Sequence, residues 1–177
     1  MSLKHDTRIA TLVDAYCAAN YRWELDGRWH ALRIGHPAPE LEAVYPDCPC
    51  FGLVSAWDPQ SVPRPEPVNR TADEALHTTL LASGYAFRAG FSSAANRSWR
   101  EPSWVVMGIA MAELDRLAQR FGQLGTLGWC RGEPVRLRMY ARQPLLAAAR
   151  EYVDWIDTAG PAAPQRGLRT AKRDSEA

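Results

Sequence analysis

The sequence predicts a single α+β domain with a ferredoxin-like βαββαβ core over residues of about 51–130. The first observation behind this prediction is the order of apolar patterns in that range, which reads strand, helix, strand, strand, helix, strand. The second is the length of 177 residues with 46% hydrophobic and 23% charged side chains, which suits one domain with a sizeable core. We expect residues 1–158 to form the domain and the Pro-, Ala- and Arg-rich residues 159–177 to be a disordered tail.

An N-terminal helix and a β-hairpin are expected before this core. A helix is predicted over residues of about 7–18, because its apolar side chains fall on one face. Asp26-Gly27 then stands between two β-prone runs and predicts a two-residue hairpin turn, since both residue types tolerate positive φ. Across that turn Trp23 faces His30, so we interpret His30 as a packing partner and not as a catalytic residue.

The core elements follow at short intervals. They are a strand at 51–57, a helix at 71–83, strands at 85–91 and 103–109, a helix at 110–121 and a strand at 126–130. The helix is predicted to begin at Thr71 because Thr71-x-x-Glu74 is a capping box. Before it, four prolines stiffen the loop at 58–70 without allowing regular structure. A loop of this length inside a compact domain often covers or binds a ligand.

Two further elements are expected after the core. Residues 135–140 alternate apolar and charged side chains, which is typical of a half-exposed edge strand. Pro144 is predicted to start a C-terminal helix that runs to about Thr158, with apolar residues along one side. Because exposed edge strands pair with other chains, the strands at 21–34 and 135–140 favour a homodimer.

The cysteines are expected to be thiols, and no metal or cofactor is predicted. They are Cys17, Cys48, Cys50 and Cys130. Cys48-Pro-Cys50 has neither the CxxC spacing of a redox motif nor the second pair that a zinc site needs. We therefore interpret Cys48 and Cys50 as ordinary thiols at the start of a strand. The four histidines show no metal-ligand spacing, and the common phosphate-binding and nucleophile motifs are absent from the sequence.

Charge and hydropathy exclude several classes of partner. The net charge of +1 gives no electrostatic reason to expect nucleic acid or an anionic membrane as a partner. No apolar run approaches the length that spans a bilayer, and the N-terminus lacks the apolar region of a signal peptide. We therefore expect a cytoplasmic protein, in which thiols stay reduced.

The predicted connectivity gathers polar residues at one edge of the sheet. In a ferredoxin-like order, the first core strand ends there, its helix begins there, and the loop at 92–100 lies there. The candidate ligand-binding residues are Trp57, Asp58, Asn69, Arg97, Arg100, Glu101 and Gln123. Arginine binds carboxylate or phosphate and amides fix orientation, so the edge suits a polar or anionic small molecule. The alternative is that these are ordinary loop residues, with Asp58 starting a turn and Asn69 capping a helix.

Several stretches together resemble one bacterial family. They are LRIGHPAPEL at 32–41, SAWDPQS at 55–61, Asn69, EPSWVVMGI at 101–109 and RFGQ at 120–123. Their order and spacing over residues of about 15–131 are similar to the domain-of-unknown-function family numbered 3293. The resemblance implies no activity, only that eight residues match recurring family positions: Trp57, Pro59, Asn69, Glu101, Pro102, Phe121, Gly122 and Gln123. The chain departs at Asp58, where members usually have asparagine, and at Leu124-Gly125, where they often have Asn-Ala.

Three functions stay open on this reasoning, so whether the protein is an enzyme is open too. The first is a small-molecule-binding or regulatory domain that uses the edge site. The second is a small enzyme with Asp58 and Glu101 as an acid–base pair, since two carboxyls on one edge separate in pKa when one is buried. The third is a protein–protein interaction module that presents tryptophans such as Trp99, Trp104 and Trp129.

Overall fold

The computed structural model describes residues 3–145 and 149–156. In this part of the chain it contains four α-helices, one short 3-10 helix and eight strands. In chain order these are α1 (Leu3–Ala18), β1 (Asn20–Leu25), β2 (Arg28–Leu32), α2 (Pro39–Val44), β3 (Cys50–Val54), the 3-10 helix (Pro59–Ser61), α3 (Glu66–Ser83), β4 (Ala86–Ser93), β5 (Arg100–Met107), α4 (Met111–Arg120), β6 (Gly125–Cys130), β7 (Arg136–Met139) and β8 (Val153–Trp155). None of these helices has the length and apolar character needed to span a bilayer.

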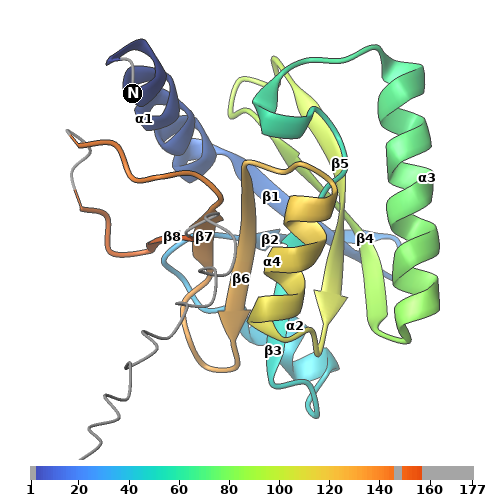
Figure 1. The fold of residues 1–177 in the computed structure, drawn as a ribbon. Coiled ribbons are helices and arrows are strands. Elements are labelled where there is room, and N and C mark those ends of the chain that lie inside the picture. The colour runs from blue at the N-terminus through green and yellow to red at the C-terminus, as the bar shows by residue number, and fades with distance from the viewer. Residues whose placement is uncertain (1–2, 146–148, 157–177) are drawn as a thin grey trace, which may run out of the picture.

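All eight strands belong to one curled sheet with the order β2-β1-β4-β5-β3-β6-β7-β8 (Figure 1). Neighbouring strands are antiparallel, except that β7 and β8 are parallel. The sheet bends far enough for Ile34, which follows β2, to form a bridge with Val135, which precedes β7. The amide of Gly35 donates to the carbonyl of Val135 over 2.8 Å. The mixed α+β class predicted from the sequence is confirmed.

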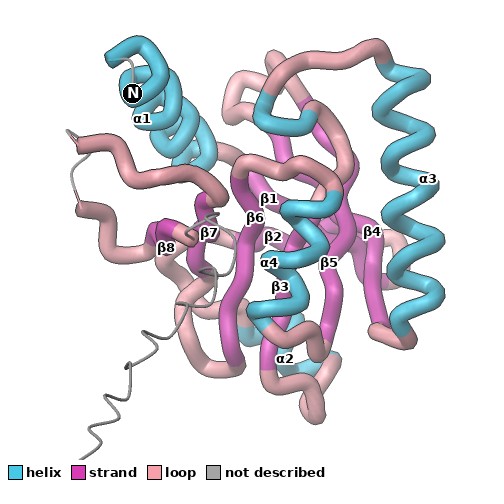
Figure 2. The backbone as a smooth tube through the Cα atoms, in the orientation of Figure 1, coloured by secondary structure: helices cyan, strands magenta, loops and turns pink. Residues whose placement is uncertain are grey.

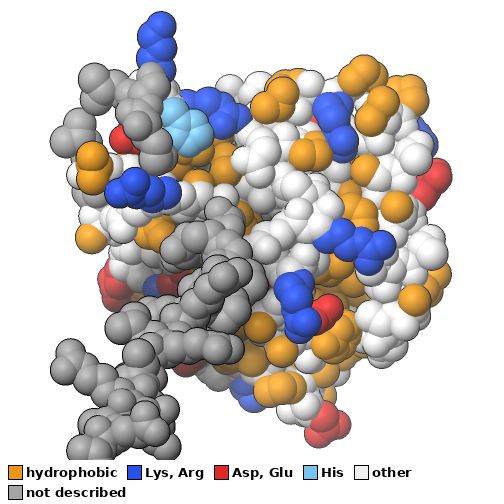
Figure 3. All heavy atoms as spheres, in the orientation of Figure 1, with side chains coloured by type: hydrophobic (Ala, Val, Ile, Leu, Met, Phe, Trp, Pro, Cys, Tyr) orange, Lys and Arg blue, Asp and Glu red, His pale blue; other side chains and the backbone are white. Residues whose placement is uncertain are grey.

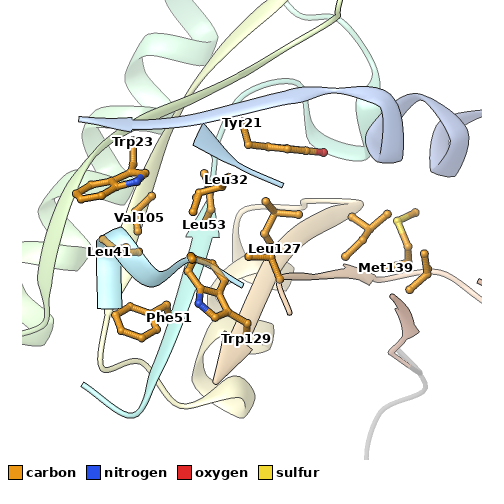
Figure 4. Packing of buried hydrophobic residues seen from close by; sticks show 14 of the residues in the cluster. Tyr21, Trp23, Leu32, Leu41, Phe51, Leu53, Val105, Leu127, Trp129 and Met139 are labelled. Atoms are coloured by element: carbon orange, nitrogen blue, oxygen red, sulfur yellow. The ribbon is translucent and has the colours of Figure 1, made fainter. Parts of the chain in front are cut away.

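The two faces of the sheet carry separate cores. Along β5, Val105 and Met107 point into the curl, whereas Trp104 and Val106 point the other way, as the period of a strand requires. Inside the curl, α1 and α2 cover apolar side chains that point toward one another (Figure 4). Among them are Tyr21, Trp23, Leu32, Leu41, Phe51, Leu53, Val105, Leu127, Trp129 and Met139. On the outer face, α3 and α4 pack over the second core, and Figure 2 shows both helices well apart from α1.

The predicted hairpin is confirmed. Asp26 and Gly27 form its turn with φ values of 49° and 77°, and both therefore use the left-handed conformation. Trp23 pairs with His30 across β1 and β2, and their ring centroids are 4.8 Å apart. The Nδ1 atom of His30 also lies 2.8 Å from a carboxylate oxygen of Glu40. Both contacts agree with the interpretation of His30 as a packing residue.

Helix α3 begins five residues before the predicted start at Thr71. The helix runs from Glu66, with Pro67 in its first turn. Proline is compatible with this position because the first amides of a helix have no partner within the helix. The hydroxyl of Thr71 donates to the Pro67 carbonyl over 3.1 Å and does not cap the helix. The irregular loop is therefore shorter than expected and ends at Pro65.

The predicted C-terminal helix is wrong for the residues that the structure describes. Residues 149–156 hold no helix, and Val153–Trp155 instead pair with β7 as β8. Pairing with β8 gives hydrogen-bond partners to the backbone groups on the outer side of β7. It also buries Val153 in the inner core and places Asp154 beside Arg136. For this reason β7 is not the edge strand that the sequence suggested. The predicted tail at 159–177 lies outside the described residues.

The expectation that all cysteines are thiols is wrong for Cys50 and Cys130. These residues are directly opposite each other in the β3–β6 pair, and a disulfide joins them with Cα atoms 4.0 Å apart. They are 80 residues apart in sequence, so only the strand pairing brings them together. Cys17 and Cys48 are free and partly buried.

The surface carries a mixture of side-chain types. On the face in Figure 3, Lys and Arg side chains are spread singly among hydrophobic and neutral atoms. This distribution agrees with the net charge of +1.

Candidate functional site

A pocket of about 220 Å³ lies between α1, the loop after β3 and the start of β5. It is lined by Leu12, Ala15, Tyr16, Asp58, Ser61, Pro63, Trp99 and Glu101. A smaller cavity of about 30 Å³ shares four of these residues, Tyr16, Asp58, Ser61 and Glu101. It adds polar side chains from Ser55, Ser92, Gln123 and Thr126. We call these two spaces, which share part of their lining, the Glu101 pocket; it has an apolar mouth and an interior of mixed polar and apolar side chains.

The loop that carries Asp58 has an unusual backbone. Asp58, Gln60 and Ser61 have φ values of 41°, 58° and 53°, which are uncommon for residues other than glycine. Such conformations cost on the order of 1–3 kcal/mol each and persist only where the surroundings impose them. The loop is therefore held in place by contacts with the rest of the fold.

Asn69 supplies the central contacts of this loop. Its side chain is only 2% exposed, and its Oδ1 accepts hydrogen bonds from the Asp58 amide over 3.0 Å and from the Arg64 guanidinium over 2.9 Å. Its Nδ2 donates to Asp58 Oδ1 over 2.7 Å. The same carboxylate oxygen accepts from the Arg64 amide over 2.8 Å. Asn69 and Arg64 thereby fix both the backbone and the carboxylate of Asp58.

The residues that follow α4 also hold the Asp58 loop in place. Gln123 donates from Nε2 to the Trp57 carbonyl over 3.0 Å, and the Gln60 amide donates to the Gly122 carbonyl over 2.9 Å. Gly122 has a φ of +66°, and a Cβ atom at this position would lie 3.0 Å from Cβ of Pro59. Glycine is therefore required at 122 for two reasons, its conformation and the close approach of Pro59.

Helix α1 closes the opposite side of the pocket. The hydroxyl of Tyr16 contacts the hydroxyl of Ser61, and the guanidinium of Arg8 donates to the Gln60 carbonyl. The hydroxyl of Tyr21 donates to the Tyr16 carbonyl over 2.9 Å and holds the last turn of α1 against β1. The N-terminal helix thus forms a wall of the pocket.

Glu101 is the titratable group of greatest interest in the pocket. It points into the curl, where it is paired across the sheet with Ser92. Burial, and secondarily the nearby carboxylate of Asp58, raise the pKa of Glu101 to about 7. Within the part of the chain that the structure describes, no side chain or amide donates a hydrogen bond to the side-chain carboxyl of Glu101. A carboxyl in this state can bind a donor or exchange a proton near neutral pH.

Five of the seven sequence-predicted site residues lie in or directly beside this pocket. Asp58, Glu101 and Gln123 line it, whereas Asn69 and the Trp57 carbonyl hold its loop. The indole Nε1 of Trp57 is buried with no hydrogen-bond partner in the described chain. The remaining two residues, Arg97 and Arg100, are not in this pocket and line a separate groove. The ligand-binding role of all seven stays a prediction.

Sequence reasoning did not select Tyr16, Ser61 or Trp99 as site residues. Tyr16 was expected on the apolar face of the first helix, and that face is where it lies, but the helix packs beside the polar edge. Trp99 was noted only as a tryptophan that could be exposed. The signal that could have identified Ser61 is its place in the proline-rich loop at 58–70.

The described residues contain no group of three or more His, Cys, Asp or Glu side chains arranged to hold a metal ion. Asp58 and Glu101 could contribute two carboxylates to a cation, with neutral oxygens from Ser55, Ser61 and Thr126 nearby. Two carboxylates and hydroxyls are few for a dedicated metal centre. The donor set therefore suits an organic ligand better.

The family comparison covers the part of the chain that forms this loop. No curated protein and no solved structure matches the chain. A family model described as "Protein of unknown function (DUF3293)" matches residues 54–125, a range that includes all seven predicted site residues. The match confirms the family resemblance that the motifs within residues 54–125 predict.

Proposed function

We propose that the protein is a small-molecule-binding domain and that the Glu101 pocket is its binding site. The observation that carries the proposal is a carboxyl with a pKa of about 7 that faces a pocket with an apolar mouth. Groups with strongly shifted pKa values that face a cavity are concentrated at binding and catalytic sites. The strained loop around Asp58 supports the same conclusion, because strain of this kind is common at binding sites.

The ligand that fits is small and carries a hydrogen-bond donor or a cationic nitrogen. The sequence suggested a polar or anionic ligand, with Arg97 and Arg100 as anion-binding groups. Those two arginines line a different groove, and the pocket instead presents Asp58 and Glu101. A volume of about 220 Å³ is below the range of drug-sized sites, which begins at about 300 Å³. The ligand would place its apolar part against Leu12 and Trp99 and its donor against the carboxyls.

A small enzyme with Asp58 and Glu101 as its acid–base pair is the second candidate. It is favoured by the pKa of Glu101, which lies near neutral pH where general acid–base catalysis is most efficient. The two carboxyls line the same pocket, as this hypothesis requires. Turnover of a bound ligand, lost in Glu101→Gln while binding persists, would distinguish an enzyme from a binding domain.

We further propose that the domain has a ferredoxin-like core and forms a homodimer. The partial order β6-β3-β5-β4, its antiparallel pairing and the packing of α3 and α4 on one face support a ferredoxin-like core. The outermost strand β2 would be the surface for a homodimer, or for a partner protein if the domain is an interaction module. We also propose a cytoplasmic location, with the Cys50–Cys130 disulfide as an exception to the reduced thiols expected there.

A thermal-shift screen with small amines, amino acids and hydroxylated compounds tests the binding site. A ligand at a hundred times its dissociation constant adds about 2.7 kcal/mol, which raises the midpoint by several degrees. We expect a hit that is lost in Glu101→Gln and kept in Glu74→Gln, a matched change on the exposed side of α3. A hit of equal size in both variants, or no hit across the panel, would refute the proposed site.

A further inference from the structure

We propose that a second site, on the outer face of the sheet, binds a nucleotide-like small molecule in which a planar aromatic ring is joined to phosphate. The site is a groove of about 520 Å³. It is lined by Asn20, Arg22, Trp29, Phe91, Ser93, Ala95, Arg97 and Arg100. We call it the arginine groove. Its residues come from β1, β2, β4, the β4–β5 loop and the start of β5.

The arginine groove and the Glu101 pocket lie on opposite faces of the same strands. Arg22 pairs with Phe91 and Ser93 pairs with Arg100, so these side chains share one face. Their neighbours Ser92 and Glu101 alternate to the other face and line the Glu101 pocket. The two sites therefore have no side chain in common and can be tested independently.

Helix α3 covers only part of this outer face. At the covered end, the Trp104 indole donates to Asp73 of α3 over 3.0 Å, and His77 packs against both Phe87 and Trp104. Toward the other end of β4, this packing against α3 ends and the residues of the groove line the outer face. Trp29 stays 44% exposed there, although it is a large apolar side chain. A ligand would cover aromatic surface that the fold leaves open.

The charged side chains that line the groove are all positive. Arg22, Arg97 and Arg100 line it without any acidic residue. In the part of the chain that the structure describes, none of these three guanidinium groups forms an ion pair or a hydrogen bond. By contrast, Arg138 of β7 binds Asp115 through two hydrogen bonds of 2.8 Å. Guanidinium groups with free donors bind phosphate through paired hydrogen bonds, so the charge favours a phosphorylated ligand.

The aromatic residues explain why the ligand should also carry a ring. Trp29 and Phe91 meet edge to face with centroids 4.8 Å apart, and the Arg100 guanidinium lies over the Phe91 ring at 4.0 Å. A planar base could stack on the exposed indole while its phosphate reaches the guanidinium groups. Asn20 and the Ser93 hydroxyl can add hydrogen bonds to the base or the sugar.

The size and charge favour a free nucleotide over a nucleic acid. The volume falls within the usual range for small-molecule sites. Three arginines can neutralise the phosphates of one nucleotide, but the net charge of +1 supplies no extended path for a polymer backbone. The proposal is therefore a mononucleotide or dinucleotide site.

Isothermal titration calorimetry of the full chain with ADP tests this proposal. Adenosine and inorganic phosphate serve as the two halves of the ligand, and a short single-stranded RNA serves as the polymer. We expect ADP to bind more tightly than either half and less tightly as the salt concentration rises. No detectable ADP binding, or binding of RNA with none of ADP, would overturn the proposal.

Variants assign the binding to the groove. Arg97→Ala and Arg100→Ala should each weaken ADP binding about tenfold or more, because each removes a charge-assisted hydrogen bond. Trp29→Ala should weaken ADP more than inorganic phosphate, since only ADP has a ring to stack. Arg120→Ala is the matched control, because Arg120 also lies over an aromatic ring, at 5.5 Å from the Phe121 centroid, but on α4. Equal losses in Arg100→Ala and Arg120→Ala would refute the assignment, and thermal unfolding of each variant identifies any that fail to fold.

Discussion

Glu101 couples the stability of the protein to pH. The folded state raises the pKa of this carboxyl from 4.5 to about 7, chiefly through burial. Because the folded state favours the protonated form, the contribution to stability is complete below pH 4.5 and is lost as the pH rises through 7. Asp73 shifts in the same direction, mainly through burial, so the effect of Glu101 must be measured as a difference between variants.

Glu101→Gln should remove this pH dependence while keeping the shape of the side chain. Between about pH 4 and about pH 8, the free energy of unfolding of the wild type should fall by about 1–3 kcal/mol relative to the variant. Urea unfolding of both proteins across this range measures the difference. Glu74→Gln, at an exposed position on α3, should follow the wild type. Parallel curves for wild type and Glu101→Gln would show that Glu101 titrates normally.

Asn69 is expected to contribute more to the stability of the fold than to ligand binding. It is buried and bonds to Asp58 and Arg64, so Asn69→Ala would leave the Asp58 amide without its partner and the Arg64 guanidinium with the Ala56 carbonyl alone. We expect a loss of about 2–4 kcal/mol in the free energy of unfolding. Asn96→Ala is the control, because exposed Asn96 makes a single local hydrogen bond to the Ser98 amide. A loss in Asn69→Ala no larger than in Asn96→Ala would contradict the structural role.

At the scale of elements, the end of α4 determines where the loop after β3 can lie. Gly122 permits both the left-handed turn and the approach of Pro59. Gly122→Ala should lower the free energy of unfolding by about 1–3 kcal/mol. It should also weaken ligand binding in the Glu101 pocket, because the loop would have to move. Gly84→Ala is the matched control. Gly84 ends α3 with a φ of +75°, and a Cβ atom added at this position would have no other atom within 4 Å.

The comparison separates strain from contact. Both variants place alanine in a left-handed conformation, so the extra loss of stability in Gly122→Ala reports on Pro59 alone. Chemical denaturation of the two variants measures this difference. Equal losses would show that the loop adjusts to the added methyl group and that its position is not determined by the end of α4.

Elements also differed in how well local sequence predicted them. The hairpin at Asp26-Gly27 is correct because the turn chemistry and the strand alternation act within a few residues. Helix α3 is longer than the capping box at Thr71 predicts, because proline is compatible with the first turn of a helix. The C-terminal segment was predicted as a helix from its apolar spacing, but pairing with β7 favours a strand at 153–155.

At the scale of the whole molecule, curling of the sheet separates the predicted site residues into two groups. The strand alternation sends Glu101 into the curl and Arg100 to the outer face, although they are adjacent in sequence. Connectivity alone assigns both residues to one edge, because it carries no information on the direction of each side chain. The single edge site that it predicted corresponds to a pocket and a groove on opposite faces of the sheet.

The sequence by itself determined the mixed α+β class, the hairpin and the match of residues 54–125 to the DUF3293 family. These features depend on local periodicity, turn chemistry and short motifs, which act over a few residues. Only the tertiary structure decided the Cys50–Cys130 bond, strand β8, the wall that α1 builds beside Glu101 and the assembly of three arginines around Trp29. Each of these joins segments far apart in the chain, and such contacts form only when burial of apolar surface brings the segments together.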